Sequence, residues 1–190
     1  MDESVVKHLN PESYDVVMLY DYHSIGTEKL PLTDEFAEYS HVYIVAWSMG
    51  VMIATIIAEK IFEADKIMGK TAVNGTLFPI NETFGISPRI YDLTVRRFDE
   101  AGRDKFISGM FDNGVPEKLV IRRSLQTQKL ELEALKTYAS EENFKYTKIF
   151  ISDNDKIIPS GKQCAYWGIE PNLKGGHCPF FGFEKWGELL

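Results

Sequence analysis

The feature that most constrains this chain is an apolar segment followed closely by a segment of helical length, with one serine between them. Residues 41–46 (His-Val-Tyr-Ile-Val-Ala) are apolar at successive positions, as in strands buried on both faces of a parallel sheet. Residues 51–62 have the length of a helix, and only Trp47-Ser48-Met49-Gly50 lies between the two. The sequence therefore predicts a strand, a tight turn at Ser48 and a helix.

Small residues stand on either side of this turn. Ala46 and Gly50 occupy the positions that must be small in the G-x-S-x-G pattern, where a strand and a helix pass closely and a strained turn exposes the serine hydroxyl. The start of the helix would place the Met49 N–H where an oxyanion can form. Taken alone, the pattern is equally explained by a chance small-x-Ser-x-Gly in a strand–helix turn.

A serine nucleophile needs a base and an orienting acid, and candidates for both follow Ser48. His177 is the one histidine after the serine, and it lies in a glycine-containing loop. Asp153 and Asp155 both follow a strong predicted strand at 147–152, and either could be the orienting acid. Singly, the histidine could belong to a surface loop and Asp-Asn-Asp to an Asx turn. Together, the order Ser, Asp, His with each residue after a predicted strand favours a Ser-His-Asp hydrolase.

The other segments complete an α/β pattern, in which strands alternate with helices. Further strands are expected at 15–22, 71–74 and, more weakly, 169–173, and short helices at 3–9 and 183–190. Helix starts are expected at 33–36, at Ser87-Pro88 and at Pro116-Glu117. We expect a mostly parallel sheet flanked by helices, built from 1–83 and 143–190, with 84–142 as a helical insertion.

Composition excludes several other classes of protein. The chain has 190 residues, and its 21 Lys and Arg against 28 Asp and Glu give a net charge of −7, so nucleic acid is a poor partner. No apolar run approaches the roughly 20 residues of a membrane span, and the N-terminus has no signal-peptide pattern. Cys164 and Cys178 are too few for a disulfide framework or a metal site, which favours a cytoplasmic protein with reduced thiols. No pattern indicates a cofactor. His8, His23 and His41 precede the turn and are expected at the surface.

Three motifs carry a family resemblance. Ala46-Trp47-Ser48-Met49-Gly50-Val51, 155–159 (Asp-Lys-Ile-Ile-Pro) and 176–180 (Gly-His-Cys-Pro-Phe) together resemble the BioG type of pimeloyl-acyl carrier protein methyl ester esterase, an α/β-hydrolase. The resemblance covers essentially the whole chain. It implies hydrolysis of the methyl ester of pimeloyl-acyl carrier protein in biotin biosynthesis, without a metal. It also implies Ser48 as nucleophile, His177 as base, Asp155 as acid with Asp153 as the fallback, and Trp47 in the substrate site. The family's helical lid would correspond to 84–142.

The sequence departs from this family at its start. The family's first strand and an oxyanion loop like Gly-Trp-Gly-Met-Asp precede the first helix, whereas this sequence begins at Met1-Asp2. We therefore expect the sheet to lack that strand and to retain the Met49 N–H as its single oxyanion donor. The predicted strands at 15–22 and 41–46, which would flank the missing strand, are expected either to pair directly or to leave an exposed edge.

All the arginines fall inside the expected lid, whereas the lysines are spread along the chain. Acyl carrier proteins are acidic, and arginine is favoured for binding carboxylate and phosphate groups. We expect Arg96, Arg97 and Arg103 to dock the carrier protein. The alternative is a solvated helix surface with local pairs such as Asp92–Arg96 and Asp99–Arg103.

Two further functional interpretations fit the same residues. One is a thioesterase or small-ester carboxylesterase that uses the same triad. The other is a catalytically impaired hydrolase fold that only binds an acyl chain or a partner, which the short N-terminus favours.

Overall fold

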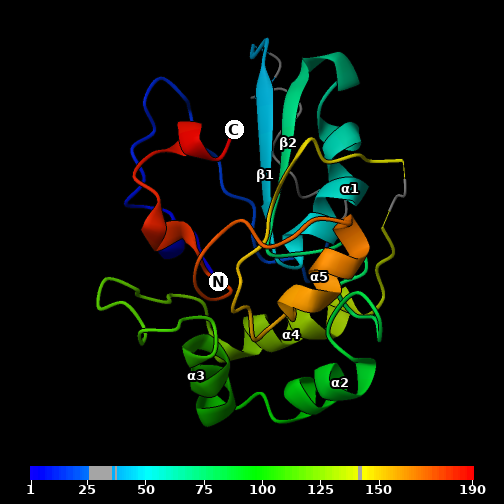
Figure 1. Ribbon diagram of the computed structural model, residues 1–190, viewed down its shortest axis with the longest axis vertical. Coiled ribbons are helices and arrows are strands. Elements are labelled where there is room, and N and C mark those ends of the chain that lie inside the picture. Colours follow the sequence, from blue (N-terminus) through cyan, green and yellow to red (C-terminus); the bar gives the residue numbers. More distant parts are fainter. Residues whose placement is uncertain (26–35, 37, 141–142) are drawn as a thin grey trace.

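The computed structural model describes residues 1–25, 36, 38–140 and 143–190. Within them, three parallel strands form one sheet in the order β1-β2-β3, with β1 at Val42–Trp47, β2 at Ile67–Val73 and β3 at Lys148–Phe150 (Figure 1). Ala46 pairs with Ala72, and Ala72 pairs with Ile149. The parallel sheet confirms the α/β class that the alternating pattern predicts.

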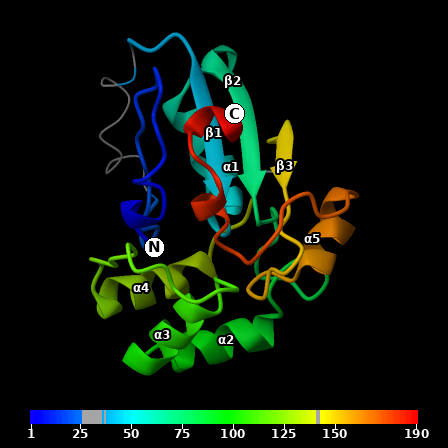
Figure 2. The same cartoon turned by 60° about the vertical axis from the view of Figure 1, so that its left-hand side comes forward.

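One face of the sheet is covered by helices. Helix α1 (Gly50–Ile61) packs against β1, and helix α5 (Ser160–Trp167) lies toward β3 (Figures 1 and 2). The core between them uses small side chains, with Ala46, Ala54, Ala58 and Ala72 all buried. Small residues let the helix backbone approach the strands closely, so the Ser48 turn is held tightly at the carboxyl end of β1.

The opposite face is covered by both ends of the chain. Successive strand residues point to opposite faces, so Trp47 and Val73 pack here against Val5, Phe180 and Leu189. This layer contains the short 3₁₀ helices η1 (Glu3–Val5), η4 (Phe180–Gly182) and η5 (Trp186–Glu188), and a further one, η3 (Ala64–Lys66), leads into β2. The predicted helices at 3–9 and 183–190 are therefore reduced to single turns.

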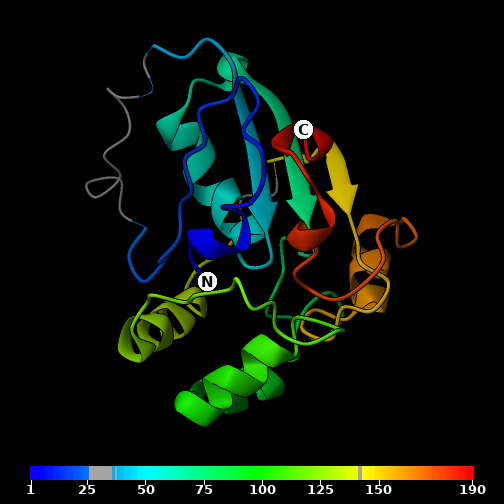
Figure 3. The same ribbon diagram turned by 90° about the vertical axis from the view of Figure 1, so that its left-hand side faces the viewer.

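A helical layer lies across the carboxyl ends of the strands (Figure 3). It contains α2 (Pro88–Arg96), α3 (Glu100–Ser108) and α4 (Leu125–Leu135), all between β2 and β3 in the chain. Pro88 begins α2 as expected, and the Asp99 and Ser124 side chains cap α3 and α4. The expected helix at Pro116-Glu117 is wrong, because only one turn forms there, closed by Leu119 N–H to the Pro116 carbonyl.

The predicted strand at 15–22 is also wrong. This segment runs beside β1 without pairing, Val17 is 56% exposed, and Asp21 has a left-handed φ of 71°. A groove of about 530 Å³ separates the segment from β1, which in the described residues pairs only with β2. Strand pairing requires backbones roughly 5 Å apart. Here the apolar side chains of the segment line the groove instead, so the sheet is open beside β1.

The remaining expectations have mixed outcomes. The strand predicted at 169–173 is reduced to an isolated bridge between Ser152 and Leu173. The helix start expected at 33–36 lies outside the described residues except for Phe36, which is in a turn. No helix in the part of the chain that the structure describes has the length and apolarity needed to cross a bilayer.

Candidate active site

Ser48 lies in the turn between β1 and α1, with a left-handed φ of 58°. This strained conformation is held from the neighbouring strand, because the Ser48 N–H donates to the Val73 carbonyl (3.0 Å). Glycine is required beside it at Gly75, where an added Cβ would lie 2.4 Å from the Ser48 carbonyl oxygen and 2.6 Å from Val51 Cγ2. The expected close approach at Gly50 is looser, with 3.3 Å to the Tyr22 hydroxyl.

His177 reaches Ser48 from the loop that follows residue 173. Its Nε2 lies 2.7 Å from Ser48 Oγ, and its side chain is fully buried. The loop packs against the chain after α3, since Cys178 N–H donates to the Met110 carbonyl. A Cβ at Gly176 would come within 2.6 Å of that same carbonyl oxygen. The glycine therefore allows the loop to lie close enough for the imidazole to meet the serine.

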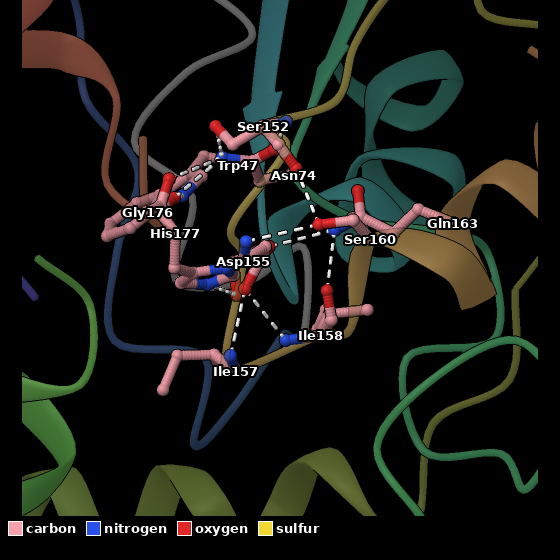
Figure 4. A network of polar contacts seen from close by, with 12 residues as sticks. Trp47, Asn74, Ser152, Asp155, Ile157, Ile158, Ser160, Gln163, Gly176 and His177 are labelled. Atoms are coloured by element: carbon pink, nitrogen blue, oxygen red, sulfur yellow. Dashed lines mark hydrogen bonds and ion pairs between the residues drawn. The ribbon is translucent and has the colours of Figure 1, made fainter. Parts of the chain in front are cut away.

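Asp155 completes the hydrogen-bonded chain. Its Oδ2 lies 2.7 Å from His177 Nδ1, and its Oδ1 accepts from the N–H groups of Ile157 (2.8 Å) and Ile158 (3.0 Å) (Figure 4). The carboxylate is buried, and Gln163 Nε2 also donates to Oδ2 (2.8 Å). These N–H groups replace water around the buried carboxylate, so both of its oxygens have hydrogen-bond partners.

Asp153 has a different environment. It is exposed, and its side chain contacts Lys174 (2.7 Å) and the Gly175 N–H (3.0 Å) rather than His177. The Lys174 ammonium group, and then the Gly175 N–H, lower the pKa of the Asp153 carboxyl. Of the two candidate acids, the structure brings Asp155 to the histidine.

The arrangement suits proton transfer from the serine. A carboxylate at Nδ1 favours the imidazole tautomer with a proton on Nδ1, which leaves the Nε2 lone pair facing Ser48 Oγ. Met49 lies at the N-terminus of α1. Its N–H is used by none of the hydrogen bonds in the described ranges, so this donor remains open to an oxyanion beside Ser48.

Three polar residues of this site carry no recognisable sequence motif. Gln163, on α5, bridges Asp155 and the Ile158 carbonyl. Ser160 accepts from the Asp155 N–H and donates to the Ser152 carbonyl. Asn74 is fully buried after β2. The one signal in the sequence is the Asn74-Gly75 pair that ends a predicted strand, a combination typical of a tight turn.

Trp47 lies against the histidine. Its indole N–H donates to the His177 carbonyl (2.8 Å), and the centroids of the indole and imidazole rings are 5.4 Å apart. The polar atom of Trp47 therefore supports the histidine loop. Its role in substrate binding stays a prediction.

The expected docking arginines lie in the helical layer, at the end of α2 and on α3. Arg96 and Arg97 are exposed at the end of α2, and neither forms a salt bridge in the described part of the chain. Arg103, on α3, pairs with its neighbour Asp104. The local pairs Asp92–Arg96 and Asp99–Arg103 do not form as salt bridges, since Asp92 contacts Lys136 and Asp99 caps α3.

Among the described residues, no group of histidine, cysteine and acidic side chains could hold a metal ion. Cys178 is buried beside His177, and burial raises the pKa of its thiol to about 12. The thiol is therefore protonated at neutral pH and is a poor nucleophile.

Comparisons with known proteins show the family of this chain. Residues 1–189 match the family model described as pimeloyl-ACP methyl esterase BioG. The chain is 30% identical over 195 residues to an uncharacterized protein of Haemophilus influenzae, covering 97% of this chain and 86% of that one. It is 31% identical over 174 residues to a malonyl-[acyl-carrier protein] O-methyltransferase of Bacteroides fragilis, covering 88% of this chain but only 34% of that longer protein.

Solved structures show the same relationship. The crystal structure of BioG from Haemophilus influenzae matches with a TM-score of 0.81 and 28% identity, over 98% of this chain and 88% of that one. A putative aryl esterase from Burkholderia cenocepacia, at 12% identity and a TM-score of 0.50, shares the fold over 75% of this chain and 59% of that one. The fold is therefore α/β-hydrolase-like, and the chain belongs to the BioG family of pimeloyl-ACP methyl esterases.

Proposed function

We propose that this protein is a serine carboxylester hydrolase that removes the methyl ester from pimeloyl-acyl carrier protein, a step in biotin biosynthesis. The observation that supports it most strongly is the pair of 2.7 Å contacts joining Ser48, His177 and Asp155. The family supports the esterase activity and the carrier-linked substrate.

The mechanism follows from the positions of the atoms. Ser48 Oγ attacks the ester carbonyl carbon while His177 Nε2 takes its proton, and Asp155 stabilises the imidazolium that forms. The Met49 N–H donates to the oxyanion of the tetrahedral intermediate. When this intermediate collapses, His177 protonates the leaving methoxide, which departs as methanol. Water, deprotonated by His177, then cleaves the acyl-enzyme and releases the free carboxylate.

The helical layer of α2, α3 and α4 is proposed as the lid over this site. It lies at the carboxyl ends of the strands, where the Ser48 turn also lies (Figure 2). Lid helices at this edge could cover the acyl chain and present a surface to its carrier. The proposed lid spans 84–142, and the remaining residues form the hydrolase core.

The docking surface is proposed on this layer. Arg96 and Arg97 are exposed at the end of α2, and Ile90 and Leu93 on the same helix are exposed as well, at 59% and 46%. Cations around an exposed apolar pair are complementary to an acidic carrier protein, although the chain as a whole carries a charge of −7. Arg103 would contribute less, because Asp104 already pairs with it.

The experiment compares substrates and variants. Purified protein is assayed for methanol release from methyl-pimeloyl-acyl carrier protein, for hydrolysis of a soluble methyl ester, and for hydrolysis of the matching thioester. We expect the carrier-linked methyl ester to be the best substrate. A preference for the thioester would favour the thioesterase alternative. No hydrolysis of any of the three would favour the non-catalytic binding role.

Docking is tested separately with Arg96→Glu, and with Lys145→Glu as a matched control. Lys145 is an exposed cation that precedes β3 and lies outside α2, α3 and α4. We expect Arg96→Glu to weaken use of the carrier-linked ester and to leave the soluble ester unchanged. The defect should shrink at 1 M salt, where the Debye length falls to about 3 Å. Equal losses on both esters would contradict a docking role.

A further inference from the structure

One buried asparagine connects the three loops that carry Ser48, Asp155 and His177. Asn74 follows β2 directly, is 0% exposed, and has a left-handed φ of 45°. The preceding residue, Val73, accepts a hydrogen bond from the Ser48 N–H, so the asparagine begins where the nucleophile turn is anchored.

The Asn74 side chain contacts the two other loops at once (Figure 4). Its Oδ1 accepts from the Ser152 N–H (2.7 Å), and its Nδ2 donates to Ser152 Oγ (2.8 Å), both at the start of the segment that carries the acid. The same Nδ2 lies 2.9 Å from the His177 carbonyl oxygen and 3.3 Å from that of Gly176. Every polar atom of the side chain is therefore used.

We propose that Asn74 is a positioning residue that sets the His177 imidazole against Ser48 by fixing the backbone of the histidine loop. The inference rests on the proposed Ser-His-Asp mechanism and adds a residue to it. Asn74 acts through the His177 carbonyl, which also accepts from the Trp47 indole N–H. With two donors on one carbonyl, the peptide plane of His177 is fixed, and the direction of the side chain with it.

Asparagine is well suited to this position. Its φ lies in the left-handed region, which Asn, Asp and Gly adopt more readily than other residues. The site also needs an acceptor for an N–H and a donor for carbonyl oxygens on one short side chain, which Asn provides and Asp, when ionised, does not. Without the Asn74 donor, the His177 carbonyl would keep only the Trp47 N–H and the Gly176 carbonyl would lose its Asn74 contact, so the histidine loop would be held less firmly.

The test is Asn74→Asp, with Asn172→Asp as the matched control. Aspartate keeps the shape, the tolerance of a positive φ and the acceptor for Ser152, but it turns an oxygen toward the His177 carbonyl. Asn172 similarly accepts from the Ile151 N–H and donates to the Ile149 carbonyl, and it contacts neither Ser48 nor His177. A misplacement of about 1 Å can lower a rate about 100-fold, so we expect a kcat loss of that order for Asn74→Asp.

Several readouts separate positioning from general stability. Asn74 is fully buried and lines neither the groove beside β1 nor the cavity beside Arg103 and Leu119, so KM for a soluble ester should stay near the parent value. The low-field NMR signal of the His177 Nδ1 proton should shift or disappear in Asn74→Asp and persist in Asn172→Asp. This signal needs no substrate, so it tests the inference even if ester hydrolysis is absent and the proposed function fails.

Two results would overturn the inference. One is a folded Asn74→Asp protein that retains the parent kcat and the parent Nδ1 signal. The other is an equal loss in Asn172→Asp. If Asn74→Asp does not fold by circular dichroism, Asn74→Gly takes its place, since glycine accepts the same φ without adding a charge. Failure of both to fold would also refute the inference, because Asn74 would then be required for the fold itself.

Discussion

Replacing Asp155 by asparagine removes the charge toward which four N–H groups point. Oδ1 accepts from Ile157 and Ile158, and Oδ2 accepts from Gln163 and faces His177 Nδ1. The amide oxygen of the variant can keep the two backbone donors, so its NH₂ group must face the histidine. The imidazole then accepts at Nδ1 and carries its proton on Nε2, which is the tautomer that cannot deprotonate Ser48.

The size of the effect follows from this change of tautomer. The same substitution in the serine-protease triad lowers kcat about 10⁴-fold while leaving the geometry intact, and we expect a loss of that order here. Stability should change by about 2 kcal/mol or less, because weaker hydrogen bonds are offset by the lower cost of burying a neutral group. Gln163 Oε1, which lacks a partner in the described structure, can turn to accept from the new amide.

The assay is hydrolysis of a soluble chromogenic ester at pH 8, together with urea denaturation. Asp153→Asn is the matched control, since Asp153 is exposed and pairs with Lys174, whose side chain is 95% exposed. We expect the control to retain the parent rate, because such surface pairs contribute little. If Asp155→Asn kept the parent kcat, or if Asp153→Asn were the more damaging change, Asp155 would not be the orienting acid.

Two further predictions concern the surroundings of the triad. Gly75→Ala should lower kcat more than the control Gly161→Ala. The added Cβ at position 75 would lie 2.4 Å from the Ser48 carbonyl oxygen, whereas nothing lies within 4 Å of an added Cβ at position 161. Equal rates for the two variants would contradict a tight turn at Ser48. Cys178 should resist iodoacetamide at pH 8, where a pKa of about 12 leaves about 10⁻⁴ of the thiol ionised, and react after unfolding. Because burial raises the folded-state pKa above the ordinary 9.0, the native state should lose stability as pH rises from about 9 toward 12, as measured by urea denaturation.

The local part of the site could be predicted from the sequence. The turn at Ser48 follows from an apolar strand, small neighbours and a helix, all of which are close together in the chain. His177 and Asp155 could be named because each follows a predicted strand, and parallel strands bring their carboxyl ends to one edge of the sheet. The predicted strand before His177 is only an isolated bridge, but it still brings the histidine loop to that edge. The pattern alone left Asp153 and Asp155 open and the resemblance favoured Asp155, but only the coordinates show which side chain turns toward His177.

The non-local parts could not be predicted in this way. Residues 15–22 have the apolar pattern of a buried strand, but whether a segment pairs depends on how closely its backbone approaches β1, which no pattern in the segment encodes. Pro116 is a good first residue for a helix, yet one turn forms and the chain continues as a loop. Asn74 and Gln163 are buried polar residues whose partners come from distant loops, so no spacing in the sequence reveals them.

The central claim is that Ser48 is a nucleophile activated by His177 and Asp155, and a fluorophosphonate probe tests it most directly. We expect the intact protein to be labelled, with the adduct located on Ser48 by mass spectrometry of the digested chain. Ser48→Ala should abolish labelling without loss of the folded state, because alanine fits the turn with little steric change. Asp155→Asn should label far more slowly than the parent. An unlabelled parent protein, an adduct on another residue, or labelling that persists in Ser48→Ala would contradict the account.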